Sequence, residues 1–338
     1  MKAHTIAAAA CAAALTAFTG WLALDTFVLP SVYDADAGEL NLSMFDEESA
    51  QSIAQSSQTE TGTGKSAGSR GHRSPGRQRS ESETDSDTGT TDSADTAVSS
   101  AQSYQDANMR ISLTTHEVAG TAVYVADVQL SSAQYLKSAF ADDTYGRHIT
   151  ETTSEIAAAH NAILAVNGDY YGTQESGYVI RNGVVYRDSS DGSDLLCVYA
   201  DGTMQIVSSD AYTAEELVAQ GVWQAYCFGP ALLENGEIAV SANEEVGRAM
   251  ASNPRTALGM IDSLHYVFVV SDGRTDESEG LSLSELAAFM QSLGVRTAYN
   301  LDGGGSSTMY FQGEVVNNPT TNGKQIRERE VSDIVYIG

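Results

Sequence analysis

A run of polar and glycine residues near the C-terminus has the composition of an anion-binding loop. Residues 299–308 read Tyr-Asn-Leu-Asp-Gly-Gly-Gly-Ser-Ser-Thr and follow a short apolar stretch that begins at Val295. Three consecutive glycines allow a tight turn in which several N–H groups point toward one place, an arrangement that suits phosphate or carboxylate. Asp302 stands immediately before them. Because no Gly-Lys-Ser/Thr follows, the run is not a Walker loop, and it is compatible with an anion site or with a flexible turn.

Two further clusters place polar side chains at the ends of expected strands. Residues 166–172, Val-Asn-Gly-Asp-Tyr-Tyr-Gly, combine an amide, a carboxylate and two aromatic rings after an apolar run. Arg255 directly precedes one expected strand, and Arg274 follows the next one. Each cluster alone also has the composition of an ordinary turn.

Several runs of β-branched and aromatic residues are joined by two-residue turn signals, the strongest short-range pattern for β-hairpins. The signals occur at Asn182-Gly183, Asp201-Gly202 and Asn235-Gly236. Two more runs, 257–261 and 266–270, are expected to pair with each other, and a last strand is expected at 331–337.

Three helices are predicted by capping boxes, in which a Thr or Ser precedes a Glu by three residues. They begin near Thr152, Thr213 and Ser282, and the third is the clearest because an apolar face follows its cap and Gly294 ends it. Strands outnumber helices and form hairpins. We therefore expect an α+β fold over residues 104–338, a single domain with mixed, largely antiparallel sheet and a few packed helices.

The N-terminal third predicts a membrane segment followed by a spacer. Residues 5–24 carry no charge and would span about 30 Å as a helix, which matches a bilayer core. Lys2 precedes them and acidic residues follow, so we expect residues 1–30 to anchor the chain in the cell membrane with the domain outside. A cleaved signal segment, giving a secreted protein, is the alternative. Residues 31–103, rich in Ser, Thr, Asp and Glu, are expected to form a disordered stalk.

The net charge and the lack of metal-binding motifs limit which ligands and partners the sequence supports. Most of the net charge of −27 lies on residues 104–338. This disfavours nucleic acid as a partner and leaves anion binding to local arginines or backbone amides. The histidines are scattered, and no H-E-x-x-H or EF-hand pattern occurs. The sequence therefore requires no cofactor, and calcium at the acidic surface is compatible but unsupported. Cys197 and Cys227 could form a disulfide or stay buried thiols.

Taken in order, the C-terminal motifs resemble the phosphodiester glycosidase family from about Ile163 to Ile337. The matching parts are Asn167-Gly168, the hairpin Gly177 to Gly183, Phe228-Gly-Pro230, Asn235-Gly236, Pro254-Arg-Thr-Ala257, Asp272-Gly-Arg274 and Asn300-Leu-Asp-Gly-Gly-Gly-Ser306. The last is the most specific. Two positions depart from the family pattern: Asp169 stands where relatives carry a second Gly, and Glu330 rather than a proline follows Arg329.

The resemblance implies a role for each clustered residue. Asp302 would be the carboxylate that stabilises the anomeric centre or activates water, and Asn167 would orient the sugar or the water. A guanidinium fork and a backbone nest would hold the phosphodiester, supplied by Arg255 and the amides of Gly303, Gly304, Gly305 and Ser306. Further substrate contacts are expected from Thr256, Ser307, Asp169, Tyr170, Tyr171, Arg274 and Arg329.

The function expected from this resemblance is that of an extracytoplasmic hydrolase. It would cleave a sugar-1-phosphodiester at the anomeric carbon and release a sugar and a phosphomonoester. Its substrate would be a phosphodiester-linked glycan, such as an exopolysaccharide, or a cell-wall polymer. Two alternatives stay open: a metal-dependent wall-polymer phosphodiesterase that attacks phosphorus, and a non-catalytic surface module that binds glycans through its tyrosines.

Overall fold

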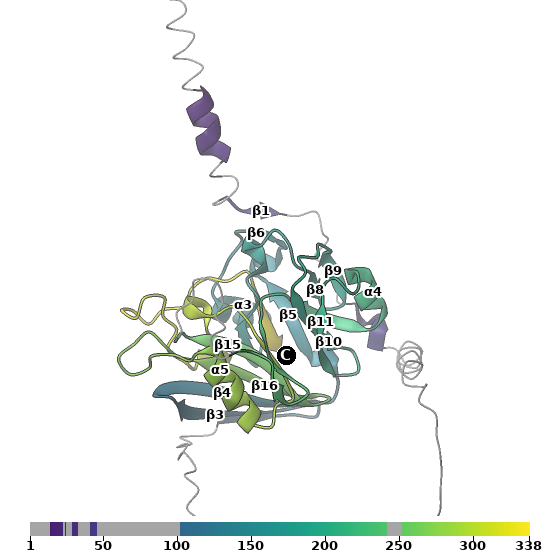
Figure 1. Ribbon diagram of the computed structural model, residues 1–338, viewed down its shortest axis with the longest axis vertical. Coiled ribbons are helices and arrows are strands. Elements are labelled where there is room, and N and C mark those ends of the chain that lie inside the picture. The colour runs from purple at the N-terminus through teal and green to yellow at the C-terminus, as the bar shows by residue number, and fades with distance from the viewer. Residues whose placement is uncertain (1–13, 23, 25–28, 33–40, 46–101, 242–251) are drawn as a thin grey trace, which may run out of the picture.

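A computed structural model of the chain describes residues 14–22, 24, 29–32, 41–45, 102–241 and 252–338 (Figure 1). Three β-sheets surround a shared apolar core, and one α-helix covers the outer face of each sheet. All pairings between the described strands are antiparallel. The expected α+β class is therefore confirmed.

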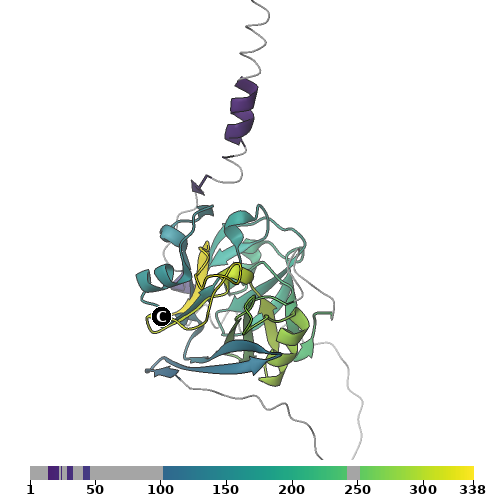
Figure 2. The same cartoon turned by 90° about the vertical axis from the view of Figure 1, so that its left-hand side faces the viewer.

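The largest sheet has eight strands, among them the two longest of the described chain. Its strands are, in spatial order, β14 (Glu237–Ile238), β13 (Ala231–Glu234), β17 (Thr297–Asn300), β15 (Arg255–Asp262), β16 (His265–Ser271), β4 (Thr121–Leu130), β3 (Met109–Val118) and β2 (Gln102–Gln105). Figure 2 shows the long β3–β4 hairpin at the end of the molecule opposite to β1.

Two five-stranded sheets pack against the eight-stranded one. The β7 sheet consists of β19 (Glu314–Val315), β18 (Met309–Phe311), β7 (Leu164–Asn167), β20 (Asp333–Ile337) and β5 (Leu136–Phe140). The β8 sheet consists of β11 (Met204–Ser208), β10 (Asp194–Tyr199), β12 (Val222–Tyr226), β8 (Val179–Arg181) and β9 (Val184–Arg187). A separate two-stranded pair joins β1 (Ser31–Val32) to β6 (Gly146–Arg147).

Alternation along the strands divides the apolar residues between a central core and three outer clusters, because successive side chains of a strand point to opposite faces. In β15, Leu258 lies in the central core and Ala257 lies in the cluster beneath α5 (Leu283–Ser292). In the same way α3 (Thr153–Ala159) covers the β7 sheet and α4 (Ala214–Ala219) covers the β8 sheet. Each sheet thus has apolar residues on both faces, although the outer face of β2 and β3 stays partly exposed.

Short 3-10 turns occupy several connections. They are η1 (Leu42–Phe45), η2 (Ala133–Tyr135), η3 (Ala141–Asp143), η4 (Tyr171–Thr173) and η5 (Gly304–Ser306). The last two lie in the segments that the sequence analysis singled out for chemistry.

The turn and cap signals predicted the local structure well. Asn182 and Gly183 have φ values of 53° and 75°, as a type I′ turn between β8 and β9 requires, and all three expected capping boxes are formed. The β3–β4 hairpin was not predicted, because its turn is Ala119-Gly120 rather than an Asn-Gly or Asp-Gly pair. Cys197 and Cys227 are free and buried, so the disulfide alternative is wrong.

The N-terminal predictions are tested only in part. Residues 14–22 are helical, while residues 1–13 and 25–28 lie outside the described chain. Within the described residues, no helix combines the length and the apolar character that crossing a bilayer demands. Residues 31–32 and 41–45 pack against the domain, so the expectation that the whole of 31–103 is an unpacked stalk is wrong for these residues. Residues 46–101 lie outside the described part.

The cap of α5 provides a test of the local folding signals. The Ser282 hydroxyl accepts a hydrogen bond from the Glu285 N–H, so Ser282→Ala leaves that N–H without its partner. We expect the free energy of unfolding to fall by about 1 kcal/mol, measured by urea denaturation. Ser282→Thr keeps an acceptor and should stay close to the parent protein. Equal stability of the Ala variant and the parent would contradict this account of the cap.

Candidate active site

The glycine loop is the connection that carries the chain from the eight-stranded sheet to the β7 sheet. It leaves β17 after Asn300 and enters β18 at Met309. Its glycines are needed for close packing: a Cβ on Gly303 would lie 2.8 Å from the Pro254 carbonyl oxygen, and one on Gly305 would collide with Thr321. The loop is therefore wedged between neighbouring segments and does not form an open turn.

The expected backbone nest is not formed. Three of the four N–H groups from Gly303 to Ser306 already donate within the protein: Gly303 to Asp302 Oδ1 (2.9 Å), Gly304 to the Pro254 oxygen (2.8 Å) and Ser306 to the Gly303 oxygen (3.3 Å). Ser307 likewise donates to the Gly304 oxygen at 3.2 Å. The prediction that these amides hold an anion was wrong, because close packing rather than anion binding explains the glycines.

Asn167 joins the glycine loop to both sheets. It is fully buried at the end of β7, and its Nδ2 donates to the Asp302 backbone oxygen at 2.7 Å. Its Oδ1 accepts hydrogen bonds from the Thr256 hydroxyl of β15 at 2.8 Å and from the Thr308 N–H at 3.4 Å. With both ends of its amide occupied, Asn167 positions Asp302, and the expected direct contact with sugar or water is not what its geometry favours.

The Asp302 carboxylate lies at the centre of a small charged cluster. Its Oδ2 accepts a hydrogen bond from Arg329 Nη2 at 2.6 Å, and its side chain is 12% exposed. The Ser306 hydroxyl accepts from Arg329 Nε at 2.9 Å. Burial raises the pKa of Asp302, while Arg329 and Ser306 lower it. The carboxylate is thus desolvated, yet it keeps partners that stabilise its charge.

Two arginines approach the glycine loop from the solvent side. Arg329 lies 5.7 Å from the centre of the half-exposed Tyr170 ring, and a Cβ on Gly304 would lie 2.8 Å from Arg274 Nη2. Burial and the nearby Arg329 lower the pKa of Arg274, whereas Asp302 raises it. These two arginines and Asp302 therefore form one electrostatic cluster.

A hollow of about 450 Å³ opens beside Arg329. It is lined by Thr150, Thr321, Asn322, Gln325, Arg327, Glu328, Arg329 and Glu330. Its lining is polar and charged, which suits a hydrophilic ligand. This hollow is called the Arg329 cavity below.

Three buried oxygen atoms at the two ends of the glycine loop have no hydrogen-bond partner among the described residues. They are Asn300 Oδ1, Ser307 Oγ and Thr308 Oγ1. A buried polar atom that lacks a partner costs free energy, so such atoms mark places where water or a ligand hydroxyl is favoured.

Arg255 does not belong to this cluster. Neighbouring residues of β15 face opposite sides, and Thr256 points to Asn167 while Arg255 Nε donates to the Leu281 oxygen at 2.9 Å on the α5 side. The prediction that Arg255 and the glycine-loop amides converge on one phosphodiester was therefore wrong. Arg329 and Arg274, expected as additional contacts, lie where Arg255 was expected.

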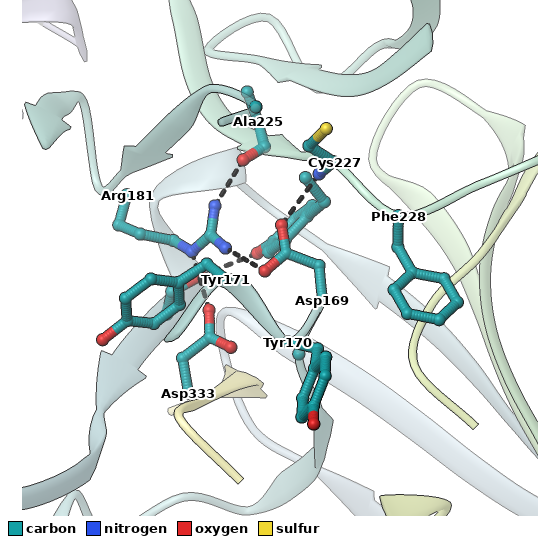
Figure 3. A network of polar contacts seen from close by, with 12 residues as sticks. Asp169, Tyr170, Tyr171, Arg181, Ala225, Cys227, Phe228 and Asp333 are labelled. Atoms are coloured by element: carbon teal, nitrogen blue, oxygen red, sulfur yellow. Dashed lines mark hydrogen bonds and ion pairs between the residues drawn. The ribbon is translucent and has the colours of Figure 1, made fainter. Parts of the chain in front are cut away.

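A second polar network lies behind Tyr170 (Figure 3). Arg181 of β8 is buried and donates from Nη2 to Asp169 Oδ1 at 2.8 Å, from Nε to Asp333 Oδ2 at 2.9 Å, and from Nη1 to the Ala225 oxygen. Asp169 Oδ2 also accepts from the Cys227 N–H at 2.8 Å. The network joins the β7 sheet to the β8 sheet.

This network corrects two expected substrate contacts. Both carboxylate oxygens of Asp169 are occupied inside the protein, and the Tyr171 side chain is buried beside Phe140 and Tyr145. Of the two tyrosines, only Tyr170 faces the Arg329 cluster. The departure of Asp169 from the family pattern therefore reflects a structural pairing with Arg181.

The sequence motifs did not identify Asp333 or Arg181, and Gly168 could be linked to Asp333 only from the structure. A Cβ on Gly168 would collide with the Asp333 carboxylate, which explains why glycine follows Asn167. Two carboxylates share one guanidinium here, and Asp333 Oδ1 has no hydrogen-bond partner in the described chain. Burial raises the pKa of Asp333 to about 7, with Arg181 lowering it and Asp169 raising it further.

The described residues contain no group of three or more His, Cys, Asp or Glu side chains placed to hold a metal ion. The charged groups at the glycine loop are those of Asp302, Arg329 and Arg274, and Arg327, Glu328 and Glu330 add further charges in the lining of the Arg329 cavity.

Comparison with known proteins places this site in a family. The model of the phosphodiester glycosidase family matches residues 160–338, which include Asn167, the glycine loop and Arg329. The chain belongs to the phosphodiester glycosidase family. The expected resemblance from Ile163 to Ile337 is thereby confirmed, and the domain is of a hydrolase type that acts on phosphodiester-linked sugars.

The individual proteins that the chain is similar to are distant from it in sequence. The chain is 26% identical over 180 residues to the SPbeta prophage-derived uncharacterized protein YomE of Bacillus subtilis strain 168. This match covers 52% of this chain and 28% of the YomE protein. The auto-inhibited catalytic domain of zebrafish N-acetylglucosamine-1-phosphodiester alpha-N-acetylglucosaminidase has the same fold. Its TM-score is 0.54 at 21% identity, over 72% of this chain and 87% of that domain. A hypothetical protein from Synechocystis gives a TM-score of 0.48 at 14% identity, over 71% and 64% of the two chains.

The raised pKa of Asp333 predicts how stability changes with pH. The folded state binds its proton more tightly than the unfolded state, whose Asp pKa is near 3.8. Its contribution to stability is therefore fully present below about pH 4 and is lost as the pH rises through about 7. Asp333→Asn should make the decline in the free energy of unfolding between pH 4 and 7 shallower, as measured by urea denaturation at several pH values. The exposed Asp262→Asn control should match the parent, and an unchanged slope for Asp333→Asn would contradict the assignment.

Proposed function

We propose that this chain hydrolyses a sugar-1-phosphodiester at the anomeric carbon. The bond between C1 and the phosphate oxygen breaks, the oxygen of water joins C1, and the phosphate leaves with its second substituent as a phosphomonoester. The observation that carries the proposal is the desolvated Asp302 carboxylate held 2.6 Å from Arg329 beside a polar cavity. A carboxylate next to a guanidinium suits a reaction in which positive charge develops at C1 while negative charge leaves on phosphate.

Arg329 is the proposed phosphodiester ligand, because its side chain is 37% exposed and a guanidinium fork matches two phosphate oxygens. Arg274 donates to Asn253 Oδ1 and to the Thr321 oxygen, so it adds positive charge beside the ligand rather than a free fork. Since phosphate is a good leaving group, holding its charge matters more here than protonating it. The half-exposed Tyr170 beneath Arg329 supplies a flat wall to the same space.

Asp302 is the proposed carboxylate that faces the anomeric carbon, as a base for water or as a nucleophile. Substrate phosphate competes for Arg329, so binding weakens the ion pair that lowers the pKa of Asp302. The carboxylate then gains basicity when the substrate is in place. Asn167 acts as a positioning residue, because it holds the Asp302 backbone rather than the substrate.

We further propose that the domain works outside the cytoplasm, tethered by its N-terminal segment. Residues 5–24 are uncharged, and in the helical part 14–22 the side chains of Leu15, Phe18 and Trp21 are more than half exposed. Such a surface is favoured in a bilayer rather than in water. A phosphodiester-linked glycan at the cell surface is then the accessible substrate.

Replacing Asp302 tests the assigned role. Asp302→Asn should lower kcat on a methyl sugar-1-phosphodiester by about 100-fold or more. Binding of the substrate should be kept or strengthened, because Arg329 is no longer shared with a carboxylate. Asp262→Asn serves as the control and should turn over normally. A rate within a few-fold of the parent for Asp302→Asn would remove Asp302 from the mechanism.

The position of bond cleavage is tested with water labelled by oxygen-18. Attack at carbon places the label in the released sugar, whereas attack at phosphorus places it in the phosphomonoester. We expect the label in the sugar. Label in the phosphate would instead support the wall-polymer phosphodiesterase, and glycan binding without turnover would support the binding module.

A further inference from the structure

We propose that the N-terminal segment of this chain is clamped onto the domain beside the Arg329 cavity, which directs the site toward the membrane and to sugars linked through phosphate to a lipid. The inference rests on the proposed hydrolysis of sugar phosphodiesters and extends it to the substituent on the phosphate. Two contacts of the N-terminal segment and the position of the cavity carry it.

The first contact is the pairing of β1 with β6. Ser31 is the partner of Arg147 and Val32 is the partner of Gly146 in an antiparallel register. Gly146 is required there, because a Cβ on this residue would collide with the Ser31 carbonyl oxygen. Figure 1 shows β1 beside β6 at the end of the molecule from which helix 14–22 extends.

The second contact lies at the turn between β8 and β9. The Asn41 N–H donates to the Asn182 oxygen at 3.0 Å, and its side-chain amide donates to the Gly183 oxygen at 3.1 Å. The Phe45 ring meets the buried Trp223 edge to face at 5.0 Å. Specific polar bonds and aromatic packing together make this a built docking site rather than a chance contact.

Both ends of the stretch 46–101 are consequently attached to the domain. Phe45 packs on Trp223, and Gln102 begins β2 of the eight-stranded sheet. Residues 46–101 therefore do not separate the apolar segment from the domain. The connection that does so runs from Leu24 to Ser31 and reaches at most roughly 25 Å.

The Arg329 cavity lies close to the β1–β6 pair. Thr150, which lines the cavity, is three residues beyond Arg147 and hence within about 10 Å of it along the chain. The Thr150 hydroxyl donates to Glu330 at 2.9 Å, and Glu151 exchanges two backbone hydrogen bonds with Val331. The segment that carries Arg329 is therefore bound to the segment that receives β1.

The loop that carries Tyr170 is hydrogen-bonded to the segment that follows β6. The His148 N–H donates to the Gly172 oxygen at 3.2 Å, and Gly172 belongs to η4, which begins directly after Tyr170. In the described residues of 102–338, four large apolar side chains are exposed: Tyr170, Tyr212, Ile238 and Ile326. One of them belongs to this region, since Tyr170 underlies Arg329. Ile326 instead lines a different hollow, together with residues of β3 and β4.

These distances decide between two kinds of substrate. A flexible stalk of about 70 residues would place the domain about 45 Å from its anchor on average and in no fixed orientation. The clamp instead keeps the cavity edge within about 35 Å of the end of the apolar segment. A polar cavity at that position receives a sugar phosphate headgroup whose lipid chain stays in the bilayer. Hydrolysis then yields the free sugar and a lipid phosphomonoester.

The test compares one sugar-1-phosphate esterified with a long polyprenyl chain in phospholipid vesicles and with methyl in solution. The full chain is reconstituted in the same vesicles, with Val32→Pro/Asn41→Ala/Phe45→Ala as the clamp-released form. We expect release to lower kcat/KM on the polyprenyl ester by about 10-fold, through lost effective concentration. The rate on the methyl ester should stay within two-fold.

The other outcomes separate the two proposals. Equal loss on both esters, or no loss on either, would overturn the clamp as a substrate-presenting device. A parent protein that cleaves the methyl ester but prefers it to the polyprenyl ester would overturn the lipid assignment alone. Absence of turnover on both esters would reject the proposed function itself.

Docking is tested independently of activity by a cross-link. Ser31→Cys/Arg147→Cys places two thiols at paired positions of an antiparallel ladder, within the range that a disulfide spans. Oxidation should join them in the full chain, whereas Ser31→Cys/Asp262→Cys should stay open as the control. No cross-link at the paired position would contradict the β1–β6 contact, whatever the kinetics show.

Discussion

The site depends on the Asn167 side chain, which is the point where two sheets and the glycine loop are held together. Its Nδ2 donates to the Asp302 backbone oxygen, and its Oδ1 accepts hydrogen bonds from Thr256 and Thr308. A buried amide that loses a hydrogen-bond partner costs free energy. The three hydrogen bonds of Asn167 therefore fix the position of the Asp302 backbone. The loop thereby holds the mostly buried Asp302 carboxylate next to Arg329.

Two acidic residues near this junction, Asp302 and Asp333, have different roles because their surroundings differ. Asp302 keeps one face toward solvent and is balanced by Arg329, so it stays available to a ligand. Asp333 is fully enclosed and shares Arg181 with Asp169, so its chemistry is confined to a proton and to the stability of the fold. The same residue type thus serves a candidate reactive site at Asp302 and a buried structural ion pair at Asp333.

Local signals in the sequence predicted much of the fold, and their limits are physical. Asn-Gly turns and capping boxes act over four residues and were correct, and Asp302 was recognisable from its place before three glycines. The orientation of Arg255 was not recognisable, since an apolar strand buried on both faces does not reveal which face meets the site. The pairing of Arg181 with Asp333 joins residues far apart in the chain, and glycines required for close packing look the same as glycines required for anion binding.

The proposed mechanism requires Arg329 to bind the phosphodiester next to Asp302. Calorimetric titration with a non-hydrolysable sugar-1-phosphonate ester measures this directly. We expect Arg329→Gln to weaken its binding by at least about 10-fold, while the exposed Arg110→Gln leaves the Kd unchanged. Equal affinity of Arg329→Gln and the parent protein would contradict the assignment.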